Sequence, residues 1–286
     1  MTPCILVGRV AGTEGHMSQF FLRAITFAVL ALCAASCTTS PLGRRQVNFY
    51  SNHEMERMGA LSFEKIKAES PRSNDTAKLA YVNCVTASIV GAMDGERASD
   101  WEVVVFENDA ANAFALPGRK IGVHTGLLNV ARNQDQLATV VGHEVGHVIA
   151  NHSNERVSQG QLAQAGMVAT QIVGQSQGLD AEQQQLLGLL GAGVIQGGFL
   201  LPFSRTHEAE ADLIGLDLMA RAGFDPAQSV DLWENMSQGG GGQPLEFFST
   251  HPSHSTRIRG LNQRIPAAQQ LREEARTRGV IPRCGP

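Results

Sequence analysis

The sequence predicts an α+β domain that is mostly α, with a small β-sheet beside one metal-binding helix. Three observations predict this fold. A His-Glu-Val-Gly-His pentapeptide at 143–147 lies within a helical pattern, apolar residues recur at helical spacing over most of the chain, and three short runs before the pentapeptide are typical of strands. A chain of 286 residues has room for one sizeable domain with short appendages.

The first element is a predicted signal peptide, residues 1–36, with Met17 as an alternative start. Arg23 precedes the apolar run 24–35, which ends in small residues before Cys37. Such a run is too short for a membrane-spanning helix and is typical of a cleaved export signal.

Cys37 directly follows the expected cleavage site. A cysteine at this position resembles a bacterial lipobox, so we expect Cys37 to be lipidated and residues 37–50 to form a lipidated tether. Ala34 stands where leucine is usual in such a motif. The alternative is plain cleavage that leaves the product without a lipid.

Two helices and three strands follow. Residues 54–67 and 76–93 show the apolar spacing of helices, while 101–106, 112–116 and 120–124 are typical of strands. The rest of the chain is expected to be largely helical.

The pentapeptide carries the chemistry. Residues four apart lie on the same face of a helix, so His143 and His147 can offer two imidazole nitrogens to one metal ion. Glu144 projects beside them, where its carboxylate can accept a proton from a water molecule at the metal. Asn133 and Gln136 resemble the capping pair at a helix start. The alternative is a chance match on a buried helix.

A catalytic zinc usually has three protein ligands, and the pentapeptide supplies two. Ala150 and Ser153 stand where one known arrangement requires glycine and histidine, which excludes that arrangement, and His152 lies off the metal-facing stripe. A second helix over 204–218, rich in carboxylates, is the other source. Spacing alone leaves four residues of that helix open as the third ligand: His207, Glu208, Glu210 and Asp212.

These patterns together resemble a known family. His-Glu-x-x-His followed by Glu-x-x-Ala-Asp at 208–212 is similar to the gluzincin metallopeptidases related to HtpX and the CAAX prenyl proteases. Further segments resemble the periplasmic lipoprotein branch of that family, with its BepA-, LoiP- and Oma1-like peptidases. They are Gly43-Arg44-Arg45-Gln46, Asn112 to Gly118, Thr125 to Leu128, Ser204-Arg205 and Thr250-His251-Pro252.

The resemblance implies a zincin-like (gluzincin) metallopeptidase domain over 51–275, followed by a C-terminal tail over 276–286. It also implies that one strand of the sheet is an open edge that pairs with an extended substrate. Arg119, just after this strand, stands where relatives often carry glycine. The residues of the substrate-binding edge strand would be Asn112, Ala113, Phe114 and Ala115.

The resemblance also assigns the metal site. It implies one Zn²⁺ per chain, held by His143, His147 and Glu208, with Glu144 as the catalytic base. Asp212 would orient a ligand histidine through its second ring nitrogen. His251 would lie near the zinc, where it either stabilises an oxyanion or occupies the open coordination position in a resting state; His254 and Arg257 are weaker candidates for nearby contacts.

The implied function is that of a zinc-dependent endopeptidase of the bacterial cell envelope, acting on misfolded or unassembled envelope proteins. With Cys37 lipidated, we expect a periplasmic protein anchored to the outer membrane, with the outer-membrane assembly machinery as a further partner. The alternative is a zinc-stabilised chaperone or assembly factor with little turnover. Without residues 1–36 the chain has 21 basic and 26 acidic residues, which argues against nucleic acid as a partner.

The cysteine count predicts one disulfide. Of five cysteines, Cys4 and Cys33 would leave with the signal peptide and Cys37 would be acylated. Two remaining cysteines in an oxidising periplasm often pair. We therefore expect a Cys84–Cys284 disulfide that joins the tail to the second helix.

Residues 158–203 separate the two metal-binding helices. They consist of a Gln-rich stretch followed by leucines among glycines. One interpretation is a mobile apolar element that covers the cleft or touches lipid. We favour the other, a buried helical hairpin with small-residue packing.

Overall fold

The computed structural model describes residues 37–176, 203–238, 247, 249, 251 and 255–285. The predicted signal peptide lies outside the described residues. Within them the chain is mainly helical with two small sheets, which confirms the predicted fold class. The strands are β1 (Cys37–Thr39), β2 (Arg45–Val47), β3 (Glu102–Phe106), β4 (Ala113–Leu116) and β5 (Lys120–His124). The helices are α2 (Asn52–Glu69), α3 (Thr76–Gly91), η1 (Ala98–Asp100, 3-10), α4 (Thr125–Val130), α5 (Gln134–Ile149), α6 (His152–Ser176), α8 (Arg205–Arg221), α9 (Gln228–Gln238) and α11 (Ser255–Thr277).

The larger sheet has the strand order β3-β5-β4, with β3 parallel and β4 antiparallel to β5. In the described part of the chain β4 pairs with β5 alone, so its other side is an open edge. The β4–β5 turn contains Gly118 and Arg119 with φ angles of 85° and 61°. A left-handed backbone is unfavourable for arginine, and two hydrogen bonds from the Arg119 guanidinium to Glu96, at 2.8 and 2.9 Å, accompany it.

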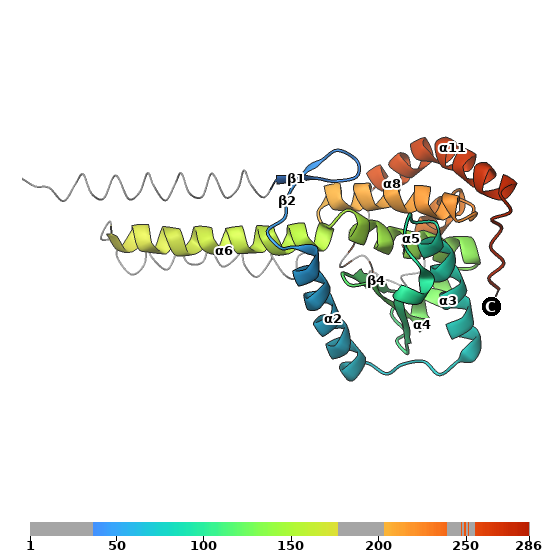
Figure 1. Ribbon diagram of the computed structural model, residues 1–286, viewed down its shortest axis with the longest axis horizontal. Helices are drawn as coiled ribbons and strands as arrows, with labels where there is room; N and C mark the ends of the chain where they lie inside the picture. Colours follow the sequence, from blue (N-terminus) through green and yellow to red (C-terminus); the bar gives the residue numbers. More distant parts are fainter. Residues whose placement is uncertain are drawn as a thin grey trace, which may run out of the picture.

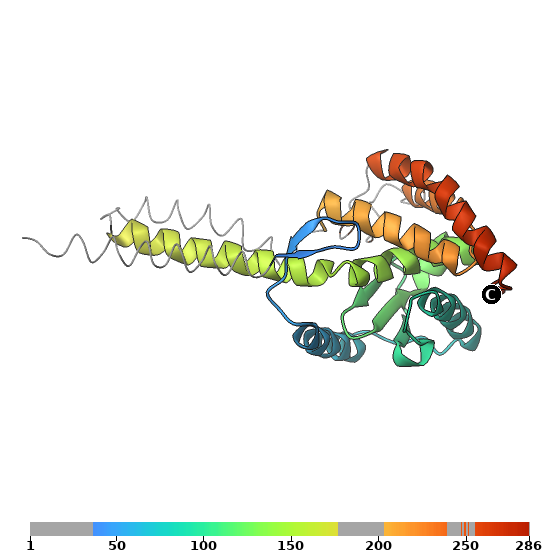
Figure 2. The same cartoon turned by 45° about the horizontal axis from the view of Figure 1, so that its top comes forward.

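Helix α5 forms the centre of the domain. Its cap residue Asn133 accepts a hydrogen bond from the backbone N–H of Gln136, in agreement with the predicted helix start. The residues from Gln136 to His147 are buried, because α5 packs on the sheet and α3 on one side and on α8 on the other. Figures 1 and 2 show α8 lying along α5, with α11 packed on α8.

The contact between α5 and α8 is made by glycines. A methyl group at Gly215 would lie 2.7 Å from the carbonyl carbon of Gly142, and one at Gly146 would lie 2.8 Å from the carbonyl oxygen of Ala211. Because no side chain stands between them, the two backbones touch. This close approach brings the metal-binding stretches of the two helices within ligand distance of each other.

Residues 37–50, the predicted tether, are packed against the domain. β1 and β2 form an antiparallel hairpin in which Cys37 is paired with Val47. Gln46 is buried and donates a hydrogen bond of 2.6 Å to the carbonyl of Ala150, at the end of α5. The hairpin therefore lies directly behind the end of the metal-binding helix.

The described start of the 158–203 segment, residues 158–176, is largely exposed rather than buried as predicted. It continues α6 as one helix to Ser176, and Figures 1 and 2 show α6 projecting away from the rest of the domain. Two of its apolar side chains, Leu162 and Val168, are exposed. Residues 177–202 lie outside the described residues.

The C-terminal tail returns to α3. Cys84 and Cys284 form a disulfide with a Cα–Cα distance of 5.6 Å, and the backbone N–H of Cys284 donates to the side chain of Gln134 at 2.7 Å. The tail is thus attached beside the start of α5. None of the described helices is long and apolar enough to span a membrane.

Candidate metal centre

Four buried donor groups converge where α5 meets α8. The predicted ligands His143, His147 and Glu208 lie together with His251, and one ligand atom of each lies within 4.8 Å of all the others. The Nε2 atoms of His143 and His147 are 3.1 Å apart, and the Glu208 carboxylate lies 3.4 Å from each. Nδ1 of His251 lies 3.0 Å from Glu208 Oε1 and 3.3 Å from His143 Nε2.

These separations fit one zinc ion. Zinc binds imidazole nitrogen and carboxylate oxygen at about 2.0–2.2 Å, so the corners of its tetrahedron are about 3.3–3.6 Å apart. The separations of 3.0–3.4 Å lie at or just below this range. Oε2 of the fully buried Glu208 accepts no hydrogen bond from the described residues, which leaves a lone pair for a cation.

Asp212 and Arg257 support the cluster from the α8–α11 side. Asp212 Oδ1 lies 3.0 Å from Nδ1 of His143, so it can accept the ring N–H and direct Nε2 toward the metal. Arg257 donates two hydrogen bonds of 2.7 Å to Asp212, and its Nη1 lies 2.8 Å from Glu208 Oε2 as an ion pair without hydrogen-bond geometry. Burial raises the pKa of Asp212, but the charge and hydrogen bonds of Arg257 outweigh it and keep Asp212 ionised.

The two histidines of the pentapeptide differ in their affinity for protons. Burial lowers the pKa of His143, but contacts with Asp212 and Glu208 outweigh this effect and raise the pKa to about 9. Burial lowers the pKa of His147 well below its usual value. Burial raises the pKa of Glu208, and its three histidine neighbours reverse the direction. In the metal-free site a proton is therefore favoured on His143 over His147.

Glu144 lies beside the donor cluster rather than within it. Its Oε2 accepts a hydrogen bond of 3.3 Å from the backbone N–H of Ala115, and its Oε1 lies 3.4 Å from Nε2 of His251. Oε1 is without a hydrogen bond from the described residues. Burial raises the pKa of Glu144, although the charges of His251 and His143 oppose it. A buried carboxylate with a raised pKa and a free oxygen suits proton transfer.

The β4 edge lies next to Glu144. The N–H of His124 donates to the carbonyl of Asn112 at 3.0 Å, so Asn112 and Phe114 face β5 and the backbone groups of Ala113 and Ala115 point to the open edge. The ring of Phe114 packs against Phe63 and Phe106 in the domain. Of the four predicted edge residues, Ala113 and Ala115 thus direct backbone groups to the open edge, where their N–H groups donate to Asn112 Oδ1 at 2.9 Å and to Glu144 Oε2 at 3.3 Å.

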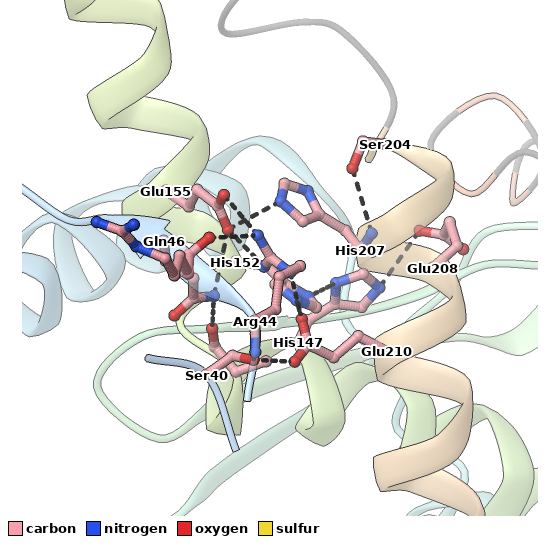
Figure 3. Close-up of polar contacts among 12 residues, drawn as sticks. Ser40, Arg44, Gln46, His147, His152, Glu155, Ser204, His207, Glu208 and Glu210 are labelled. Carbon is pink, nitrogen blue, oxygen red and sulfur yellow. Dashed lines mark hydrogen bonds and ion pairs between the residues drawn. The ribbon is translucent and has the colours of Figure 1, made fainter. Parts of the chain in front are cut away.

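A second buried polar cluster adjoins His147 (Figure 3). The sequence left His207 and Glu210 open as ligands, but the structure turns both toward this cluster, where Nε2 of His207 lies 3.0 Å from Glu155. This second cluster was not predicted from the sequence. Two local features pointed to it: the Gly43–Gln46 segment of the resemblance, and a histidine five residues after His147. Cys84 and Cys284 form the disulfide and are outside both clusters, and Cys37 starts β1. The second cluster consists of Arg44, His152, Glu155, His207 and Glu210.

The chain is similar to known peptidases over most of its length. It is 37% identical over 237 residues to the mitochondrial metalloendopeptidase OMA1 of Schizosaccharomyces pombe, covering 80% of this chain and 66% of that protein. It is 31% identical over 239 residues to the mitochondrial metalloendopeptidase OMA1 of Homo sapiens, covering 81% and 45%. The beta-barrel assembly-enhancing protease of Escherichia coli is 28% identical over 239 residues, covering 78% and 48%. The chain thus spans about two thirds or less of each of these relatives.

The chain also matches a family over more than half of its length. Residues 76–265 match Peptidase family M48, a range that contains the pentapeptide, Glu208 and the whole three-stranded sheet. This agrees with the relatives above and confirms the gluzincin resemblance of the sequence. Because the match covers well over half of the residues, the chain belongs to peptidase family M48.

Proposed function

We propose that this protein is a zinc-dependent endopeptidase whose metal is held by His143, His147 and Glu208. The observation that supports this most directly is the buried four-donor cluster with ligand-like spacing, next to a carboxylate that is not a ligand. His251 supplies the fourth donor in this conformation, which corresponds to a resting state. Substrate binding then requires His251 to leave the cluster.

The metal and Glu144 have separate roles in hydrolysis. Zinc, when bound, supplies a Lewis acid that stabilises developing negative charge and makes water more acidic. Glu144 accepts a proton from the attacking water at Oε1 and passes it to the leaving amine. Its raised pKa makes it a better proton acceptor than an exposed glutamate. Asp212 holds His143 in the tautomer that presents Nε2 to the metal.

The substrate is an extended stretch of polypeptide. The main-chain carbonyls of Ala113 and Ala115 on the β4 edge can pair with any sequence, since the pairing uses backbone alone, and the N–H of Ala115 joins the pairing once it leaves Glu144. A cavity of about 230 Å³ is lined by His147, Met55 and Pro117, and the last two also line an adjoining, largely apolar cavity of about 520 Å³. We propose that this second cavity takes an apolar side chain of the substrate, which favours unfolded segments over polar surface loops.

The cellular role is proposed from the amino terminus and from one relative. The pattern before Cys37 supports export and lipidation, and hence a periplasmic protein anchored to the outer membrane. The Escherichia coli relative is named a beta-barrel assembly-enhancing protease. On these grounds we propose a role in the quality control of misfolded or unassembled envelope proteins. The relatives named here are all called peptidases or proteases, which favours turnover over a purely chaperone function.

The test compares the full chain with its Glu144→Gln variant. Zinc-loaded protein should cleave an unfolded polypeptide, and a chelator should stop the cleavage. Glu144→Gln should keep its zinc and lose about 10²- to 10⁴-fold in rate, since that is the usual contribution of a general base. Retained cleavage by Glu144→Gln overturns the assignment of the base. A lack of cleavage by the zinc-loaded parent overturns the endopeptidase proposal.

A further inference from the structure

The second buried cluster joins three separate parts of the chain. His152 and Glu155 belong to the start of α6, His207 and Glu210 to the start of α8, and Arg44 to the β1–β2 hairpin. The first four side chains are at most 5% exposed. Figure 3 shows them packed between the hairpin and the metal ligand His147. Such a concentration of buried polar groups is unfavourable unless each one is paired.

The cluster begins at the metal ligand itself. Nε2 of His147 faces the other donors, so it must present a lone pair and the ring proton must sit on Nδ1. Nδ1 of His147 lies 2.9 Å from Nδ1 of His152. Since the His147 N–H donates here, His152 must accept, and its own proton must sit on Nε2. That Nε2 lies 3.1 Å from Glu210 Oε2, which accepts it.

The hairpin completes the chain of hydrogen bonds. Arg44 Nε donates to Glu210 at 2.9 Å, and the Ser40 hydroxyl donates to the same carboxylate. The other edge of the Arg44 guanidinium donates two hydrogen bonds to Glu155, at 2.8 and 2.6 Å. One cation from the hairpin therefore pairs with two buried carboxylates that would otherwise face each other without a full countercharge.

We propose that His152 and Glu210 are positioning residues for the metal ligand His147, and that Arg44 of the β1–β2 hairpin completes their setting. This inference rests on the proposed function, because it takes His147 as a zinc ligand. It makes residues 37–47 a structural part of the metal centre rather than a passive tether. Cleavage or displacement of this hairpin would remove Arg44 from the cluster and thereby weaken zinc binding.

Zinc affinity of the full chain tests the proposal without any substrate. His152→Leu removes the acceptor for His147, Glu210→Gln removes the charge at the end of the chain, and Arg44→Ala removes the cation. Each should weaken zinc binding about 10- to 100-fold in chelator competition, the usual loss for such outer partners of a metal ligand. Each should also change the visible spectrum of the cobalt-substituted protein. His152→Asn keeps an acceptor and should recover part of the affinity.

Glu102→Gln is the matched control for Glu210→Gln. Glu102 is also paired with cations, Lys67 and Lys120, but in the sheet and away from the metal centre. The Glu102→Gln substitution should leave the zinc affinity and the cobalt spectrum unchanged. Parental affinity and spectrum in folded His152→Leu overturn the proposal, and if that variant does not fold, the same result in Glu210→Gln does so. Zinc binding without peptide hydrolysis overturns the proposed function alone, whereas a parent protein that binds no zinc overturns both.

Discussion

Gly215→Ala should separate the two metal-binding helices. A methyl group at this position would lie 2.7 Å from the carbonyl carbon of Gly142 and 2.7 Å from the backbone nitrogen of His143. These neighbours are backbone atoms of a buried helix, so they cannot rotate away as a side chain can. Carbon atoms pack at about 3.5–4.0 Å, and the helices must therefore move apart by roughly 0.8 Å or more at this point.

The size of the effect follows from two opposing contributions. Overpacking in a core costs about 1–3 kcal/mol, whereas alanine is favoured over glycine in a helix interior by about 0.8–1.0 kcal/mol. We expect the variant to be destabilised by roughly 0–2 kcal/mol. Metal sites tolerate a displacement of only about 0.5 Å, and Glu208 lies on the helix that moves. Zinc affinity should therefore fall by about tenfold or more, the equivalent of about 1.4 kcal/mol.

Gly260→Ala provides the control, because Gly260 lies within helix α11 and, outside that helix's own backbone, no atom of the described residues lies within 4 Å of an added methyl group. It should stabilise the protein by up to about 1 kcal/mol and leave zinc binding unchanged. Urea unfolding of the metal-free protein and chelator competition for zinc measure both quantities. If Gly215→Ala matched Gly260→Ala in both assays, the backbone contact would not hold the metal ligands together.

Three further predictions concern protons, charge and the disulfide. Because the pKa of His143 is raised to about 9 without metal, zinc must displace its proton. The zinc affinity should therefore rise about tenfold per pH unit up to about pH 9 and then level off. Equal zinc affinities at pH 6 and 8 in calorimetry would refute this. Arg257→Leu leaves the Asp212 and Glu208 carboxylates without the arginine cation, so the unfolding free energy of the metal-free protein should fall by about 3–5 kcal/mol. Zinc should restore part of this loss in urea unfolding. A variant as stable as the parent would contradict the pairing. Reduction of the Cys84–Cys284 bond, which spans 200 residues of chain, should cost about 2–5 kcal/mol; identical urea midpoints with and without reductant would show that it adds no stability.

The sequence predicted the sheet and the central helix closely because their signals are local. Strand β5 has the predicted bounds, and α5 begins at the predicted cap. The strand alternation and the cap each depend on residues within a few positions of one another. Periodicity could not tell whether 158–176 packs inside or projects outward, because both arrangements need the same helix. The exposed Leu162 and Val168 reveal the outcome only in three dimensions.

The choice of the third ligand needed tertiary structure or a resemblance. Glu208 and Glu210 lie two residues apart on one helix, so they point in different directions, and nothing local says which direction faces α5. The glycine contact fixes the rotation of α8 against α5, which turns Glu208 toward the histidine pair and Glu210 toward the hairpin. Spacing thus narrows the ligand set, and packing between distant segments selects from it.

His152 shows most clearly how a break in a helix changes the meaning of spacing. In an uninterrupted helix a residue five positions after His147 would be rotated by about 140° from it, away from the metal-facing stripe. Asn151, however, has a φ angle of 55°, so α5 ends there and α6 starts in a new direction at His152. Asparagine tolerates this left-handed conformation better than most residues do. The turn brings Nδ1 of His152 to 2.9 Å from Nδ1 of His147. The left-handed Asn151 that ends the metal-binding helix therefore also positions His152 as the hydrogen-bond acceptor of the ligand His147.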